Sequence, residues 1–168
     1  MNKKTKILFG YRTSNASCCT DGDDDGFLFE IYSDGTGIYN KYIVENIITK
    51  SRKFKVSDKT VSEINAILDK YKKKISALNK NIWNNSDDGC FNIFQFRKKK
   101  INTLNIEEHD IPSLANPAYY IKYHHVIMQE NIIMKIFKEI CSVLRKNHAI
   151  RLKLESVFIP LWLFIGGK

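Results

Sequence analysis

The stretch that decides the fold lies at residues 27–43 and reads FLFEIYSDGTGIYNKYI. Apolar side chains recur there at every second position from Phe27 to Ile31, a period that is typical of a strand. The Asp34-Gly35 pair supplies the positive φ angles of a two-residue hairpin turn. We therefore predict a hairpin that joins strands near 27–33 and 36–43. A two-residue turn would place Ile31 opposite Ile38 and Phe27 opposite Tyr42.

Working outward from this hairpin, the remaining chain predicts both strands and helices. Two amphipathic helices are expected at about 58–78 and 128–146, where apolar residues recur at helical spacing, and Ser57 is a good N-cap for the first. A basic stretch at 50–56 leads into that helix, and residues 107–117 are expected to be irregular. Further strands are expected at 6–13, 91–96, 101–106 and 150–158. Because hairpins dominate, the fold class is α+β, a mainly antiparallel sheet of about five to six strands with two helices packed on it.

Length and composition restrict the class of protein. The chain has 168 residues, of which 43% are apolar, so it can form one globular domain spanning 1–168. This composition excludes a disordered tail, a collagen-like repeat and a disulfide-dense mini-protein.

The net charge of the chain indicates which binding partners it favours and does not indicate its fold. A net charge of +9 and a pI near 9.3 favour an acidic partner such as nucleic acid, an anionic membrane surface or an acidic protein. The excess comes from 22 Lys against 5 Arg, and Lys lacks the bidentate fork with which Arg recognises guanine. Dedicated reading of a DNA sequence is therefore not expected.

The location is predicted from the absence of a targeting pattern. The N-terminus lacks the apolar run of a signal peptide, and the apolar run from Val157 to Ile165, broken by Pro160, is too short to cross a bilayer. We expect a soluble cytosolic protein with no membrane partner. Its cysteines (Cys18, Cys19, Cys90 and Cys141) are then thiols.

A metal site is considered at residues 21–26, DGDDDG. This turn reproduces the first six places of a calcium loop, but the twelfth place, which needs a bidentate Glu, is Tyr32. The adjacent His124 and His125, and the adjacent Cys18 and Cys19, lack the spacing of zinc ligands. We expect no metal and no other cofactor.

No catalytic arrangement is predicted either. The sequence has no Gly-x-Ser-x-Gly elbow, no phosphate-binding loop and no Gly-x-Gly-x-x-Gly pattern. Polar residues at 107–110 could supply acid–base pairs, but such clusters between a strand and a proline are usually loops. We expect that the protein is not an enzyme.

Two functions remain. The first is a protein-binding or inhibitory role, whose sharpest version is an immunity protein that neutralises a cognate bacterial toxin presenting an acidic face. The alternative is a basic domain that binds RNA or another single strand through a lysine rim and through sheet aromatics at Phe91, Phe94 and Phe96. The candidate partner-binding tyrosines are Tyr39, expected on the hairpin face away from the core, and Tyr119 and Tyr120, expected in a loop flanked by prolines. The candidate cations are Lys70, Lys73, Lys74, Arg97, Lys98, Lys99 and Lys100.

Overall fold

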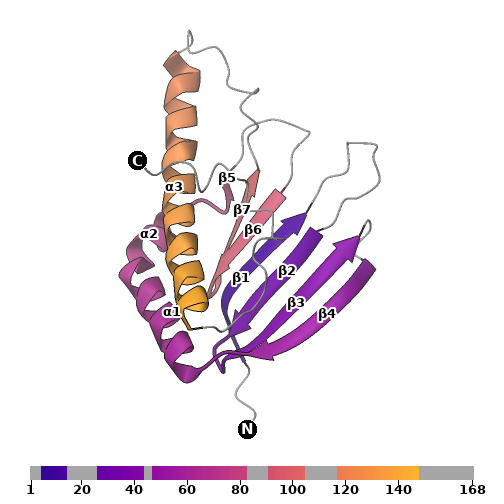
Figure 1. Ribbon diagram of the computed structural model, residues 1–168. Helices are drawn as coiled ribbons and strands as arrows, with labels where there is room; N and C mark the ends of the chain where they lie inside the picture. The colour runs from indigo at the N-terminus through magenta and orange to yellow at the C-terminus, as the bar shows by residue number, and fades with distance from the viewer. Residues whose placement is uncertain (1–4, 15–25, 44–46, 83–90, 105–116, 148–168) are drawn as a thin grey trace.

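The computed structural model describes residues 5–14, 26–43, 47–82, 91–104 and 117–147 (Figure 1). In these ranges the protein is α+β, with a mostly antiparallel sheet of seven strands and three helices. The predicted fold class is confirmed. The described residues contain seven strands, where about five to six were predicted, and three helices, of which two are seven residues or longer.

The sheet has the strand order β4-β3-β2-β1-β6-β7-β5, so that β1 lies at its centre and β4 forms one edge. All neighbours pair antiparallel except β5 and β7, which pair in parallel. The strands are β1 (Ile7–Ser14), β2 (Gly26–Tyr32), β3 (Thr36–Ile43), β4 (Ile47–Lys55), β5 (Asn81–Ile82), β6 (Phe91–Phe96) and β7 (Lys99–Leu104).

The helices are α1 (Asp58–Lys70), α2 (Lys72–Ala77) and α3 (Pro117–Lys146), and Figure 1 shows all three on one side of the sheet. Ser57 caps α1 as predicted, because its Oγ accepts a hydrogen bond of 3.2 Å from the backbone N–H of Thr60. The predicted helix over 58–78 is instead two helices that meet at Tyr71, whose φ and ψ of −99° and 7° interrupt the first. The second predicted helix begins eleven residues earlier than expected, at Pro117, whose missing N–H is tolerated at a first helical position.

The hairpin between β2 and β3 is present, but its register differs by one residue from the prediction. Ile31 pairs with Gly37, and Phe27 pairs with Lys41. The loop has three residues, 33–35, because Gly35 takes a φ of 80° at its last position. Asp34 stabilises this loop by accepting hydrogen bonds from the backbone N–H and the hydroxyl of Thr36.

The other differences concern single segments. The basic stretch at 50–56, predicted only as a lead into a helix, belongs to β4 as far as Lys55. The predicted strand at 101–106 begins two residues earlier, at Lys99, and is described as far as Leu104. The predicted strand at 150–158 lies outside the described residues.

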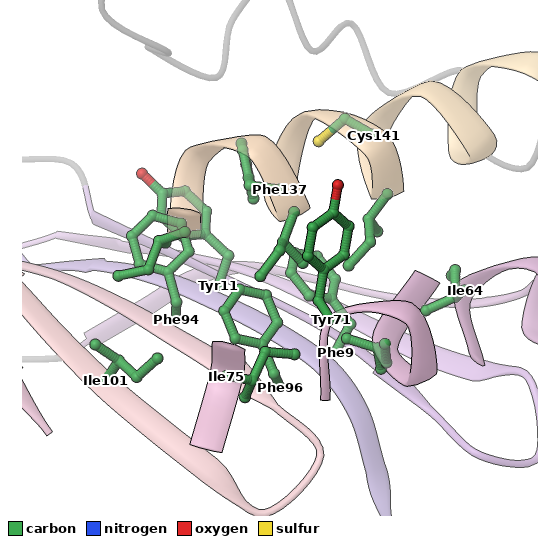
Figure 2. Close-up of a cluster of buried hydrophobic side chains, with 14 of the residues drawn as sticks. Phe9, Tyr11, Ile64, Tyr71, Ile75, Phe94, Phe96, Ile101, Phe137 and Cys141 are labelled. Atoms are coloured by element: carbon green, nitrogen blue, oxygen red, sulfur yellow. The ribbon is translucent and has the colours of Figure 1, made fainter. Parts of the chain in front are cut away.

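The core lies between the sheet and the helices, and Phe137 of α3 is at its centre. The ring centroid of Phe137 lies 5.0 Å from that of Tyr11, 5.5 Å from that of Phe94 and 6.0 Å from that of Phe9. Figure 2 shows Phe137 on α3 directed toward these side chains of β1 and β6. Cys141, one turn further along α3, is a buried free thiol as predicted, and burial raises its pKa to about 11.

Replacing Gly35 with valine should lower the free energy of unfolding by about 1 kcal/mol or more. A β-branched residue resists the positive φ, and a Cβ atom at this position would lie 2.8 Å from the carbonyl oxygen of Val56. Urea denaturation measures the loss. The Lys100→Val variant, in an exposed strand position of β7, should change the stability by less than about 0.5 kcal/mol. Equal losses in the two variants would contradict the role assigned to Gly35.

Replacing Phe137 with alanine should cost about 3–5 kcal/mol, because it removes a buried ring and leaves a cavity between β1, β6 and α3. Thermal and urea unfolding of Phe137→Ala measure this cost. Phe137→Leu keeps most of the volume and should lose clearly less stability. A small loss in Phe137→Ala would show that α3 is held on the sheet by other contacts.

Candidate protein-binding surface

One of the predicted basic segments, the turn between β6 and β7, contacts the C-terminal half of α1. Arg97, in the turn between β6 and β7, donates from Nη1 to Asp69 Oδ1 at 2.6 Å and from Nη2 to Asn65 Oδ1 at 2.8 Å. The hydrogen bond and the positive charge of Arg97 lower the pKa of Asp69. Because its guanidinium is hydrogen-bonded to α1, Arg97 mainly links the β6–β7 turn to this helix.

Lys70 is also engaged within the protein. Its Nζ lies 3.2 Å and 3.1 Å from the two carboxylate oxygens of Glu139 on α3, and the hydroxyl of Tyr71 donates to the same carboxylate at 2.6 Å. Burial raises the pKa of Glu139, but the hydrogen bonds from Tyr71 and Lys70 outweigh this effect and lower it. The Nζ atoms of Lys70 and Lys74 lie 5.0 Å and 6.0 Å from the centroid of the Tyr71 ring. These contacts join α1 and α2 to α3.

The remaining predicted cations face solvent. Lys73, Lys98 and Lys100 are exposed and Lys99 is half-buried. The ion pairs found among the described residues, Lys70–Glu139 and Arg97–Asp69, do not involve them. These lysines therefore keep their charge available at the surface.

The predictions for all three tyrosines are wrong in their local structure. Tyr39 does not lie on the face away from the core: it pairs with Phe29, and its ring stacks on that of Phe27 at 6.2 Å between centroids, on the side of the helices. The one-residue change of register causes this difference. Tyr119 and Tyr120 do not lie in a loop, because both belong to the first turns of α3.

Two of the three aromatic side chains expected as a platform on β6 are not exposed, and that of Phe91 lies outside the part of the chain that the structure describes. Phe94 and Phe96 are buried beneath α3, at 4% and 2% exposure. Their rings stack on each other and pack on Phe9 and Phe137, so bases cannot stack on them while the fold is intact. The two residues face the core because β6 turns its even-numbered positions toward the helices, where they pair with the odd-numbered Phe9 and Tyr11 of β1.

A further basic element is β4, which the sequence did not identify as a strand. It carries four cations (Lys50, Arg52, Lys53 and Lys55), no acidic residue, and exposed Ile48. All four cations are exposed, and no described strand pairs with the outer edge of β4. The charge of Lys55 acts on Asp34, whose pKa is lowered first by the hydrogen bonds of Thr36 and in small part by Lys55. In the sequence, only Ile47, Ile48 and Phe54 indicate this strand, because cations occupy both of its faces.

No metal site is found in the part of the chain that the structure describes: no group of three His, Cys, Asp or Glu side chains could hold an ion there. The acidic turn at 21–26 lies outside the described residues. Of the described helices, none combines the length and apolar character needed to cross a membrane.

One titratable group was missed by the sequence analysis. Glu130 lies on the face of α3 that also carries Val126, Ile133 and Phe137, and burial raises its pKa to about 7. The neighbouring Gln129 is buried, accepts a hydrogen bond from the backbone N–H of Asn79, and contacts Nδ1 of His125 through its amide nitrogen. The apolar neighbours at helical spacing were the only signal for the burial of Glu130.

Models of known protein families give no match to this sequence, and curated proteins give no significant similarity. The function is therefore argued from the geometry alone.

Stability should fall as the pH rises from about 5 to about 8, through the ionisation of Glu130. The pKa of this group is about 7 when folded, against an ordinary value of 4.5, so the unfolded chain releases the proton at lower pH than the folded protein. Urea unfolding of the wild type and of Glu130→Gln across this range measures the effect, and the difference between the two cancels the contribution of the histidines. Parallel pH profiles would contradict the burial of the carboxylate.

Proposed function

We propose that the protein binds an acidic surface of a partner protein and inhibits that partner by covering it. Its sharpest form is an immunity protein that neutralises a cognate bacterial toxin in the cytosol. The proposal treats the chain as a binding protein and not as an enzyme.

The observation that carries the proposal is the charge on β4. Nine residues at one edge of the sheet contain four exposed cations and no acid, and none of these cations belongs to an ion pair of the described residues. Like charges placed side by side repel each other, which disfavours the folded state, and an acidic partner removes this repulsion when it binds. The exposed lysines Lys73, Lys98 and Lys100 extend the positive field toward the opposite edge, and long-range attraction of this kind raises the rate of association.

Two observations weaken the alternative function, nucleic-acid binding. The aromatic side chains Phe94 and Phe96 are buried, and the guanidinium of Arg97 is held by Asp69 and Asn65. A single strand would have to bind through the lysine charges without stacking, and such binding is weak at physiological salt. An acidic protein can add main-chain and apolar contacts to the same charges.

A direct test compares two polyanions. Polyglutamate of about 20 residues should bind more tightly than oligothymidylate of about 20 nucleotides at about 0.15 M salt, as measured by fluorescence anisotropy. The double variant R52E/K53E should weaken polyglutamate binding about tenfold, because two attractions of about 0.4 kcal/mol become repulsions of similar size. The matched variant K59E/K138E makes the same change of charge on α1 and α3 and should weaken binding no more than about threefold.

The outcome against the proposal is submicromolar binding of oligothymidylate with weak binding of polyglutamate, which would favour the nucleic-acid function. The inhibitory step needs the native partner. The tagged protein should capture an acidic protein from its own cells and abolish the activity of that protein at equal molar amounts, and R52E/K53E should do so poorly. A captured protein that stays fully active would contradict inhibition.

A further inference from the structure

We propose that β4 takes an extended acidic segment of the partner as an additional strand of the sheet. This inference rests on the proposed function, because it specifies how the acidic partner is held. The main chain of β4 would supply the hydrogen bonds, and its four cations would select the sequence of the segment.

The first argument is the direction of the main-chain groups of β4. Val56 donates its N–H to the carbonyl of Gly35 at 2.8 Å, in the same register that pairs Gly37 with Phe54 and Tyr39 with Arg52. Inward and outward main-chain groups alternate along an antiparallel ladder. The N–H and C=O groups of Ser51, Lys53 and Lys55 therefore point away from β3, toward the side where no described strand lies.

The second argument is the rigidity of this edge. Phe54 stacks on Phe29 with 5.4 Å between ring centroids and an interplanar angle of 15°, and its ring covers Gly37 so closely that a Cβ atom there would collide with it. Phe54 thus anchors the end of β4 to the core through β3 and β2. A template that is already ordered costs less entropy when a segment pairs with it.

The third argument is the charge of the side chains. A strand added beside β4 would place its side chains about 5 Å, between Cβ atoms, from those directly opposite. Lys53 and Lys55 lie on the face of the sheet away from the helices, and Arg52 lies on the helix side opposite Tyr39. An acidic residue on either face of the added segment therefore meets a cation, and exposed Ile48 offers an apolar contact.

The same charges disfavour the commonest other occupant of a free edge, a second copy of the chain. Lysines on edge strands act against pairing between identical molecules, because two such edges repel each other. The four cations of β4 repel another β4 and attract an acidic segment. Charge complementarity thus favours an acidic segment over a second copy of the chain.

The test uses synthetic peptides that are methylated on the main chain. The parent is a peptide of about nine residues in which Glu or Asp alternates with Val or Thr. Two analogues carry N-methyl groups at all odd or at all even positions, so that each has lost the donors of one edge only. Strand addition predicts that one analogue binds at least about tenfold more weakly than the parent, while the other stays within about threefold.

A variant of β4 tests the same main-chain hydrogen bonds by changing the protein instead of the peptide. Ser51→Pro removes an N–H that points outward and leaves the bonds to β3 in place, so it should weaken binding of the parent at least about tenfold. Ser51→Ala keeps the N–H, loses only the hydroxyl contact with Asn40, and should bind as the wild type does. If Ser51→Pro does not fold, the two methylated peptides decide the question by themselves.

The outcomes separate the two proposals. If R52E/K53E weakens binding but both methylated peptides bind like the parent, strand addition is wrong and the acidic-surface proposal stands. If neither the parent peptide nor polyglutamate binds, both proposals are wrong. Concentration-dependent dimerisation that Ser51→Pro abolishes would assign the edge to a second copy and overturn the inference.

Discussion

The contact between Phe137 and the aromatic side chains of β1 and β6 is the interaction on which the other features depend. It fixes α3 over the centre of the sheet, and the bonds of Glu139 with Lys70 and Tyr71 then hold α1 and α2 beside α3. Figure 1 shows the consequence, because the helices gather over β1, β6 and β7 while β3 and β4 extend beyond them. The position of one aromatic cluster along the sheet thus leaves β4, the basic edge of the described strands, beyond the helices.

The parts of the fold that the sequence predicted are those with a strong hydrophobic period. The hairpin around Gly35, the helix after Ser57 and the stripe from Ile133 to Leu144 each have one buried face, and a buried face leaves a period in the sequence. β4 has cations on both faces and lacks such a period, so a strand was not predicted there. The predicted register of the hairpin was wrong because Asp34-Gly35 is compatible with two-residue and three-residue loops, and the hydrogen bonds that Asp34 accepts from Thr36 decide between them only in the folded chain.

The candidate site, too, could be predicted from the sequence only in part. Composition and charge runs identified the lysines, but not which of them are engaged within the protein. Arg97 and Asp69 are 28 residues apart in the sequence, and Lys70 and Glu139 are 69 apart, so neither pair follows from local spacing. In the sequence, the Phe residues of β6 are compatible with a core strand, which is the more common case, and with a stacking platform for bases. Only the placement of α3 assigns Phe94 and Phe96 to the core.

These assignments restrict how any ligand can be held at the basic edge. Exposing a buried Phe side chain to serve as a stacking platform would cost several kcal/mol, comparable with a large part of the stability of a small domain. A ligand of the intact protein must therefore use charges and groups that are already at the surface. On β4 those groups are four cations, one exposed isoleucine and the main-chain edge of a strand that Phe54 holds in place. Phosphates could use only the cations, whereas an acidic polypeptide in extended conformation could use all three kinds of group, and this difference is our reason for proposing a protein partner.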